Sequence, residues 1–479
     1  MGAAPMGPEI LGLTADSRAV KPGYLFAALP GTKLDGTRFI DDAVARGAVA
    51  ILRGGPAAVA PLAPERRPPV LVVSDPNPRR RLALMAARFH GPQPRTIAAV
   101  TGTNGKTSVA SFTRQIWQAL GMPAASLGTL GIVAPGIVKP GAMTTPDPVS
   151  LHAELAALAK SGVEHVAMEA SSHGIDQFRL DGLSIAAAAF TNLTQDHLDY
   201  HGTMAAYRTA KLRLFTDLLR GGATAVLNAD SPDFEVFAAS CRQHDHPILS
   251  FGERAGADLR IAARRPSSAG QGLDLEIFGT QHTIQLPLAG AFQASNVMAA
   301  LGLVIACGAE PDAAVATLSH LAGVPGRLQR VANHANGAAI YVDYAHTPDA
   351  LETVLKALRP HVAGRLLAVF GAGGDRDPLK RPLMGAAVAR LADVAIVTDD
   401  NPRSEKPAAI RAAVLAACPK GREIGDRAAA IRTAIGELQP GDILVIAGKG
   451  HETGQTIAGV THPFDDAEVA RRVVAELQP

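Results

Sequence analysis

Residues 98–112, AAVTGTNGKTSVASF, constrain the fold more than any other part of this sequence. A strand-like apolar run leads into a glycine turn, and apolar residues then recur at helical spacing. A strand, a glycine-rich loop and a helix in this order predict an anion site, because loop N–H groups and the helix N-terminus converge. The usual phosphate loop would have its first glycine at Val100, so an ordinary glycine turn is the alternative interpretation. The residues of the predicted loop are Gly102, Thr103, Asn104, Gly105, Lys106, Thr107 and Ser108.

Composition excludes several classes of function. The 46 Lys and Arg residues nearly balance 44 Asp and Glu residues along the chain, so no basic field indicates nucleic-acid binding. The three cysteines lie far apart, which supports neither a disulfide framework nor a zinc site and fits a reducing cytoplasm. No segment approaches 18 uncharged apolar residues, and no export signal begins the chain. We therefore expect a cytoplasmic protein without a membrane span. We also expect a monomer, although the sequence itself leaves the oligomeric state open.

The chain reads as three α/β domains, separated by Pro- and Gly-rich stretches at 91–95 and 322–327. We expect a small N-terminal α/β domain at 1–91, a central P-loop domain with a mostly parallel sheet at 92–325, and a C-terminal Rossmann-like domain at 326–479. The expected strands lie at 24–28, 48–52, 70–73, 97–101, 163–168, 185–190, 223–227, 340–342, 366–370, 394–398 and 443–447.

Two further loops follow predicted strands of the central block, at 168–173 and 191–199. Ligands in parallel sheets lie outside the carboxyl ends of the strands, so these loops should lie beside the phosphate loop. Glu169 is a good candidate for a Mg²⁺ ligand, since Mg²⁺ prefers oxygen. His197 is less natural for that ion, and it is equally well explained as the start of a helix.

Four loops of the last block each follow a predicted parallel strand, so all four should open at one edge of the sheet. They bring arginines and carboxylates toward one cleft, which suits a zwitterionic ligand with more than one carboxylate. Arginine's planar fork binds a carboxylate with two hydrogen bonds. The alternative is that these charges pair with one another. The loops are YAHTPD, GAGGDRD, DDNPR and GKGHE, and the charged residues are Arg376, Asp400, Arg403 and Glu452.

Eight motifs in order make the chain resemble the Mur ligases of peptidoglycan synthesis: TGTNGKT, MEASSHG, TNLTQDHLDYHG, VPGR, YAHTPD, GGDRD, DNPRSE and GKGHE. The family's own loop has this shortened form. The resemblance implies an ATP- and Mg²⁺-dependent ligase that forms an amide bond through an acyl phosphate. DNPR is the signature of members that add meso-2,6-diaminopimelate to the D-Glu γ-carboxylate of UDP-MurNAc-L-Ala-D-Glu, which would be the two partners of ATP here.

For the nucleotide, the resemblance implies that Lys106 contacts the terminal phosphates and that Thr107, Glu169 and His197 serve magnesium. From the sequence alone, Lys211 is an ordinary solvated helix lysine. The resemblance instead assigns it to the position that CO₂ carboxylates, where a negative group helps to hold a second Mg²⁺. By resemblance, Lys106, Lys211, Glu169 and His197 are the catalytic residues, and ATP is also reached by Asn296, Arg327, Asp343 and His346.

The resemblance also implies how the other two substrates are bound. Met143 and Gln293 depart from the family, because Asn is expected at both positions. Arg403 would hold the distal carboxylate of diaminopimelate, and lysine-adding relatives carry another residue there. The UDP-MurNAc-dipeptide would be bound by Ser17, Thr32, Lys33, Leu34, Asp35, Thr144, Thr145, Ser171, Gln177 and Arg179. Diaminopimelate would be bound by Arg376, Asp400, Asn401, Pro402, Arg403, Gly448 and Glu452.

Three alternatives remain open from the sequence. A folylpolyglutamate synthase shares the loop and both ATP-binding blocks, but it would lack the N-terminal block and DNPR. A P-loop ATPase or nucleotide switch leaves the four charged loops of the last block unexplained. A nucleotide-sugar binding protein descended from a ligase would not need intact Lys106, Glu169 and His197.

Overall fold

The computed structural model describes residues 7–31, 35–62 and 69–477, and the chain forms two compact units. The first unit comprises Met1–Lys106, Gly121–Leu227 and Ser231–Leu249, and the second comprises Thr107–Leu120, Asn228–Asp230 and Ser250–Pro479. Within the described ranges, none of the helices combines the length and apolar character needed to cross a membrane.

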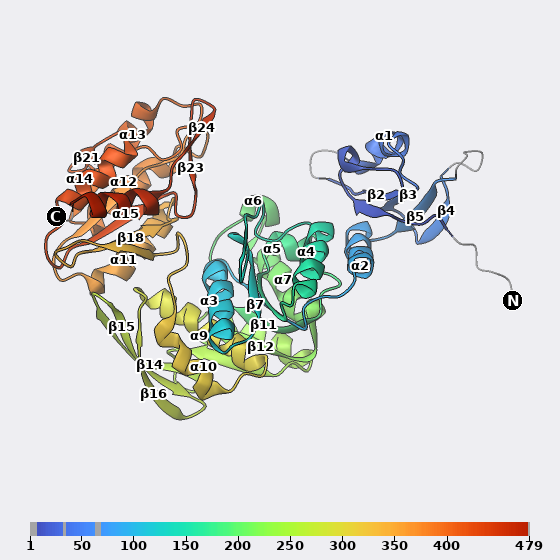
Figure 1. Ribbon diagram of the computed structural model, residues 1–479, viewed down its shortest axis with the longest axis horizontal. Helices are drawn as coiled ribbons and strands as arrows, with labels where there is room; N and C mark the ends of the chain where they lie inside the picture. Colours follow the sequence, from blue (N-terminus) through green and yellow to red (C-terminus); the bar gives the residue numbers. More distant parts are fainter. Residues whose placement is uncertain (1–6, 32–34, 63–68, 478–479) are drawn as a thin grey trace. The chain divides into compact units, whose positions relative to one another are not determined.

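A small five-stranded sheet begins the first unit (Figure 1). Its elements are β1 (Gly12–Thr14), η1 (Ser17–Ala19), β2 (Tyr24–Ala28), η2 (Gly36–Phe39), α1 (Ile40–Ala45), β3 (Ala50–Gly54), β4 (Ala58–Pro61), β5 (Leu71–Asp75) and α2 (Pro78–His90). The strand order is β1-β2-β3-β5-β4, and only β4 is antiparallel to its neighbour. Alternate strand residues pack against α1 on one face and α2 on the other, so both faces are buried.

The rest of the first unit is a larger sheet with the order β12-β11-β6-β10-β7-β8-β9. The strands are β6 (Thr96–Thr101), β7 (Ala124–Gly128), β8 (Gly131–Ala134), β9 (Ile137–Lys139), β10 (His165–Glu169), β11 (Ile185–Phe190) and β12 (Leu219–Asn228). The helices are α4 (Pro148–Lys160), α5 (Ser172–Asp176), α6 (Leu198–His201), α7 (Met204–Arg213), η3 (Leu214–Leu218) and α8 (Phe234–Gln243). The strands from β12 to β7 are parallel, so the loops after β6, β10 and β11 open at the same edge.

The second unit begins with the helix that the sequence predicted after the phosphate loop, and it continues with strands that the sequence did not predict. The elements are α3 (Lys106–Ala119), β13 (Ile248–Gly252), β14 (Leu259–Ser267), β15 (Gly270–Ile277), β16 (Thr280–Leu286), α9 (Ala291–Ala306), α10 (Pro311–Thr317) and η4 (Leu318–His320). The strands β14, β15 and β16 form an antiparallel ribbon. Gln115 of α3 exchanges two hydrogen bonds with the main chain of Ala322, at 2.8 and 3.1 Å.

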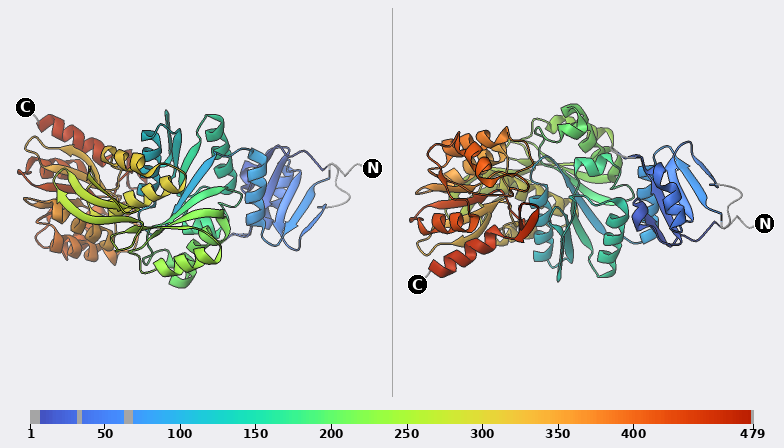
Figure 2. Two further views of the ribbon diagram at one scale, coloured as in Figure 1. Left: turned by 90° about the horizontal axis from the view of Figure 1, so that it is seen from below. Right: turned by 90° about the horizontal axis from the view of Figure 1, so that it is seen from above.

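A six-stranded sheet with helices on both faces completes the second unit (Figures 1 and 2). The elements of this part are β17 (Gln329–Asn333), β18 (Ala339–Asp343), α11 (Pro348–Leu358), η5 (Arg359–His361), β19 (Leu366–Phe370), α12 (Lys380–Leu391), β20 (Val394–Val397), α13 (Pro407–Leu415), β21 (Arg422–Glu423), α14 (Arg427–Gly436), β22 (Ile443–Ala447), β23 (Gly454–Ile457), β24 (Val460–Pro463) and α15 (Asp466–Leu477). The strands β23 and β24 pair with each other in a separate two-stranded sheet. The order is β17-β18-β22-β19-β20-β21, and only β17 is antiparallel. Helices α11 to α13 cover one face, and α14 and α15 cover the other. The predicted α/β class and Rossmann-like arrangement are therefore confirmed.

Candidate active site

The predicted phosphate loop follows β6 and is supported by the loop that follows β11. Gly102 has a φ of +153°, and a Cβ atom on it would lie 1.9 Å from Thr191 Oγ1, so only glycine fits. Thr191 Oγ1 donates to the carbonyl oxygen of Asn104 at 2.6 Å. Lys106 Nζ donates to the carbonyl oxygens of Gly102 and Thr103 at 2.8 Å each. The lysine charge is thus held beside the loop, where it would attract a phosphate group.

Lys211 of α7 is buried, with 1% of its surface exposed, so its interpretation as a solvated lysine is wrong. Its Nζ atom donates to the carbonyl oxygen of Gly102 at 2.8 Å and lies 4.4 Å from the centre of the Tyr207 ring. Burial, together with the nearby charge of Lys106, holds the pKa of Lys211 well below its usual value. A lysine in this state is a better nucleophile than a solvated one, because the unprotonated amine is more populated.

Glu169 ends β10, next to the strand that leads into the phosphate loop. The Thr129 N–H donates to Glu169 Oε1 at 2.7 Å, and Thr129 Oγ1 donates to Oε2 at 3.2 Å. A Cβ atom on Gly128 would lie 2.1 Å from Glu169 Oε1, so this close approach also requires glycine. Thr129 was not predicted from the sequence, because it follows β7 and meets Glu169 only through the order of the sheet.

His197 lies in the loop after β11, directly before α6, with a φ of +52°. Its ring centre is 4.8 Å from that of His173, and its Nε2 atom is 3.5 Å from Asp196 Oδ2. Both interpretations of His197, metal ligand and helix start, remain open. In the part of the chain that the structure describes, no group of three or more His, Cys, Asp or Glu side chains could hold a metal ion. The metal set of Thr107, Glu169, His197 and carboxylated Lys211 stays a prediction.

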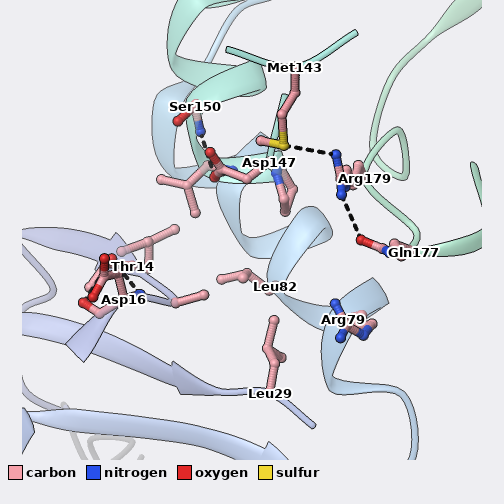
Figure 3. Close-up of a pocket in the computed structure, with 14 residues that line it drawn as sticks. Thr14, Asp16, Leu29, Arg79, Leu82, Met143, Asp147, Ser150, Gln177 and Arg179 are labelled. Atoms are coloured by element: carbon pink, nitrogen blue, oxygen red, sulfur yellow. Dashed lines mark hydrogen bonds between the residues drawn. The ribbon is translucent and has the colours of Figure 1, made fainter. Parts of the chain in front are cut away.

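A cavity of about 470 Å³ lies in the first unit and is lined by Gln177 and Arg179, both predicted for the dipeptide (Figure 3). Arg179 donates from NH1 to the carbonyl oxygen of Thr145 at 2.6 Å and from NH2 to Gln177 Oε1 at 2.7 Å. The NH1 atom also lies 3.4 Å from the Met143 sulfur, which takes the place where the family resemblance expected Asn. The arginine is therefore oriented at the wall of the cavity.

The Thr144–Thr145 pair and Ser171 form one polar network beside Glu169. Thr145 Oγ1 donates to the carbonyl oxygen of Glu169 at 2.9 Å and accepts from Ser171 Oγ at 3.0 Å. Thr144 Oγ1 lies 3.0 Å from Thr129 Oγ1. Residues predicted separately for the dipeptide and for magnesium are thus hydrogen-bonded neighbours.

Of the five N-terminal residues predicted to bind the sugar nucleotide, the structure describes Ser17 and Asp35. Thr14 and Asp16 line the cavity, and Ser17 beside them does not. Asp35 accepts from the Thr37 N–H at 2.9 Å and begins η2. The predictions for Thr32, Lys33 and Leu34 lie outside the described residues.

Asp343 in the second unit ends β18 and is buried. Its carboxylate accepts from the Leu328 N–H at 2.6 Å and from the Ala345 N–H at 2.8 Å. Burial raises the pKa of Asp343 to about 6, against the opposing charge of Arg327. This carboxylate ties the VPGR loop to the YAHTPD loop.

Asn296, Arg327 and His346 are the other residues predicted to bind ATP in this unit. Each is linked by contacts to one of the two loops that Asp343 joins. The Arg327 guanidinium lies 4.9 Å from the centre of the Tyr344 ring, and His346 Nδ1 lies 2.8 Å from the Tyr344 carbonyl oxygen. Gln293 donates to the Arg327 carbonyl oxygen at 2.9 Å and accepts from Asn296 Nδ2 at 3.0 Å. Gln293, which stands where the family resemblance expected Asn, therefore links Asn296 to the main chain of Arg327 by hydrogen bonds.

The four charged loops of the last sheet follow β18, β19, β20 and β22, which are parallel, so they open at one edge as predicted. Arg403 has a φ of +53° and donates from NH1 to the carbonyl oxygen of Gly374 at 2.6 Å. A Cβ atom on Gly374 would lie 1.9 Å from the Pro402 carbonyl oxygen, so the two loops touch. Among the described residues, neither Arg376 nor Arg403 forms an ion pair within 4.0 Å. The four charges of the predicted set therefore do not pair with one another within this distance, although the charges of Arg403 and Arg376 help to lower the pKa of the neighbouring Asp375.

The amide and carboxylate side chains of these loops contact a buried lysine that the sequence prediction missed. Asn401 Nδ2 donates to Glu452 Oε2 at 2.9 Å. Lys449 has no exposed surface and donates to Asn401 Oδ1 and Glu452 Oε2 at 3.2 and 3.3 Å. Burial raises the pKa of Asp400, while Arg427 and Lys449 oppose that rise. Lys449 lies inside the GKGHE motif, so its position was visible but its burial was not.

Three family models match the chain. They are described as the Mur ligase family catalytic domain, matching residues 9–90, the Mur ligase middle domain, matching 100–304, and the Mur ligase glutamate ligase domain, matching 326–450.

Individual relatives match over nearly the whole length. The UDP-N-acetylmuramoyl-L-alanyl-D-glutamate–2,6-diaminopimelate ligase of Caulobacter vibrioides is 58% identical over 468 residues, which are 96% of this chain and 94% of that protein. A solved structure of a ligase with the same description is 37% identical with a TM-score of 0.75, covering 98% of this chain and 96% of its own. A MurF ligase from Thermotoga maritima in complex with ADP is 19% identical with a TM-score of 0.63, covering 98% and 97%, and shows likeness of fold alone.

Proposed function

The chain belongs to the Mur ligase family, and we propose that it joins meso-2,6-diaminopimelate to the D-Glu γ-carboxylate of UDP-MurNAc-L-Ala-D-Glu at the expense of ATP. The observation that carries this proposal is the set of charged and amide side chains on the loops at one edge of the last sheet. Arg376 and Arg403 have no ion-pair partner among the described residues, and atoms of both, together with the Asn401 carbonyl oxygen, lie within 3.8 Å of the place of a Cβ atom on Gly373. Asn401 in turn donates to Glu452. The carboxylates of a ligand such as diaminopimelate match the two arginines, and its ammonium groups match Asp400 and Glu452.

The reaction takes two steps. An oxygen of the γ-carboxylate attacks the γ-phosphorus of ATP, the bond to the β–γ bridging oxygen breaks, and ADP leaves. The acceptor amine then attacks the acyl-phosphate carbonyl, inorganic phosphate leaves, and the amine loses a proton. Such phosphoryl transfer depends mainly on alignment and charge neutralisation. Lys106, held by the two loop carbonyls, supplies a positive charge to the terminal phosphates.

Two of the four residues predicted to bind Mg²⁺ carry oxygen ligands of the types that this ion prefers. Glu169 offers carboxylate oxygens that Thr129 orients, and Thr107 offers a hydroxyl, which are ligand types that Mg²⁺ prefers. The ion would neutralise phosphate charge when bound. Lys211 as an ammonium would repel the ion, so its part in the set requires the carbamate. The Lys211 ammonium first loses one proton; the neutral amine then adds to CO₂ and releases a second proton, so that a cation is replaced by an anion.

The cavity lined by Gln177 and Arg179 is proposed to bind the UDP-MurNAc-dipeptide. It contains both apolar surface, from Leu29 and Leu82, and the Arg179 charge at one wall. We further propose that the chain has three domains, at 1–91, 92–325 and 326–479. We also propose that it acts as a monomer in the cytoplasm.

The alternatives are weaker. A folylpolyglutamate synthase would lack the block that matches a Mur ligase model at residues 9–90. An ATPase without ligation would not need the cleft arginines. ADP release measured with each substrate omitted in turn tests the proposal. Steady-state release should require ATP, the UDP-dipeptide and the acceptor, and tripeptide should form only when all three are present. ADP release without tripeptide in the complete mixture would refute it.

A further inference from the structure

A fully buried ion pair lies behind the proposed acceptor cleft. Arg427 is the first residue of α14 and Asp466 the first of α15, and neither side chain has exposed surface. Arg427 Nε and NH2 donate to the two carboxylate oxygens of Asp466 at 2.7 Å each. This forked geometry fixes the plane and rotation of the guanidinium.

The same guanidinium also holds two of the cleft loops. Its NH2 atom donates to the carbonyl oxygen of Ala447 at 3.0 Å, and its NH1 atom donates to that of Asp399 at 3.4 Å. Ala447 ends β22 directly before Gly448, and Asp399 lies directly before Asp400. One side chain therefore ties together the main chain of both loops that carry the amide and carboxylate side of the cleft.

Contacts at Gly448 extend this link to the Asp400 side chain. A Cβ atom on Gly448, whose φ is +121°, would lie 2.8 Å from Asp400 Oδ2 and 3.8 Å from Arg427 NH2. The carboxylate, the glycine and the guanidinium are thus packed without space between them. Arg427 also favours the ionised form of Asp400, whose pKa burial otherwise raises.

Stability alone is a weak reason to keep such a pair. The cost of removing two charges from water is large, and replacing a buried pair by apolar residues of similar volume is often neutral or stabilising. A pair that holds two loops in one relative position can instead be kept for the geometry of the site.

We propose that the Arg427–Asp466 pair is a positioning device for the acceptor site, which holds Asp400 and the Gly448 loop so that they receive the ammonium end of the incoming amino acid. This inference rests on the proposed function. Arg427 and Asp466 act through the loops and touch no substrate themselves.

The test uses the full-length enzyme and three variants. Arg427→Met combined with Asp466→Leu removes the pair while keeping side-chain volume. Arg427→Lys keeps a charge but loses the fork. Arg365→Met is the matched control, because Arg365 pairs with Asp442 at 2.7 Å directly before β19 and β22, at the opposite edge of the same sheet. The KM values for acceptor, ATP and UDP-dipeptide and the melting temperature are measured for each.

We expect the double variant to keep its melting temperature within a few degrees and to raise the acceptor KM about tenfold or more, the size typical of removing partners behind a ligand shell. The KM for ATP should change less than about twofold. Arg427→Lys should raise the acceptor KM as well, and it decides the question if the double variant fails to fold. Arg365→Met should leave the acceptor KM unchanged.

An unchanged acceptor KM in the folded double variant, or in Arg427→Lys if only that protein folds, would overturn the inference. An equal rise of all three KM values would also overturn it, since that is what a purely structural role predicts. Failure of the proposed function would show differently, as a wild-type enzyme that ligates no diaminopimelate. If the wild type accepts another amino acid, the same variants are measured with that acceptor.

Discussion

Lys106 and Lys211 each donate a hydrogen bond of 2.8 Å to the same atom, the carbonyl oxygen of Gly102. Two ammonium groups that share one acceptor repel each other, and Lys211 is also buried. The arrangement favours a state in which one of the two amines loses its charge. Because burial and the charge of Lys106 hold the pKa of Lys211 low, Lys211 is an amine expected to react with CO₂.

The first prediction concerns that reaction. Lys211→Met should lower kcat by about a hundredfold or more, the usual cost of losing one preorganised charged group at a reacting centre. Lys211→Glu, which carries a permanent carboxylate, should recover part of the activity. Enzyme prepared without bicarbonate should regain activity when bicarbonate is added, and Lys211→Glu should not respond. Equal activity of the wild type with and without bicarbonate, and no carbamate signal with ¹³C-bicarbonate by NMR, would contradict this role.

The second prediction concerns Thr129 and magnesium. Thr129→Val keeps the shape of the side chain but removes the hydroxyl that donates to Glu169 Oε2. The Mg²⁺ concentration needed for half-maximal activity should rise about tenfold, because a partner that orients a ligand is lost. Thr129→Ser keeps the hydroxyl and is the control. If Val and Ser variants need the same Mg²⁺ concentration, Thr129 does not act through Glu169.

The third prediction concerns Arg403. Removing a charge-assisted pair typically costs about 1.5–3 kcal/mol, so Arg403→Ala should raise the KM for diaminopimelate roughly ten- to a hundredfold. The KM for ATP should stay the same. L-Lysine lacks the distal carboxylate, so its poor use as acceptor should be little changed by the substitution. An equal loss for both acceptors, or of ATP binding as well, would indicate that Arg403 only supports its loop.

The fourth prediction is a dependence of stability on pH at Asp343. Burial raises its pKa in the folded protein to about 6, from the ordinary value of 3.8 for an aspartate. A raised pKa means that the folded state holds the proton more tightly, so the stability gained by protonation is complete below pH 4 and lost as the pH rises through 6. Two pKa units correspond to about 3 kcal/mol. Relative to Asp343→Asn, the wild type should therefore lose up to that amount between pH 4 and 7.

Urea titrations at both pH values measure this difference as free energies of unfolding. The Asn variant keeps an acceptor for only one of the two N–H groups, those of Leu328 and Ala345, and it cannot titrate. A difference between the two proteins that does not change with pH would show that Asp343 keeps an ordinary pKa.

Much of the parallel architecture follows from sequence. The strands at 185–190, 366–370 and 443–447 match β11, β19 and β22 residue for residue, because fully buried parallel strands are continuous apolar runs between turns. The ribbon of β14 to β16 was not predicted. Its strands carry many polar and charged residues, such as TQHTIQL in β16, since one face is exposed. A half-exposed strand of that kind has no apolar run to mark it.

Some features of the charged residues could likewise be predicted from the sequence, and others could not. Arg376, Arg403 and Glu452 could be assigned to one cleft from the positions of their loops after parallel strands. The burial of Lys211, Lys449 and Arg427 could not. Each is a charged residue on a helix or loop whose partner, such as Gly102 for Lys211 or Asp466 for Arg427, is distant in sequence. Only the folded chain brings those partners together.

The central claim is tested most directly by offering the enzyme, with ATP and UDP-MurNAc-L-Ala-D-Glu, a panel of meso-diaminopimelate, L-lysine and L-ornithine. Acceptor-dependent ADP release and the mass of the UDP-MurNAc-tripeptide are measured for each amino acid. The cleft of Arg403, Asp400 and Glu452 predicts a strong preference for diaminopimelate, in kcat/KM, over both acceptors that lack the distal carboxylate. A preference for L-lysine or L-ornithine would contradict it.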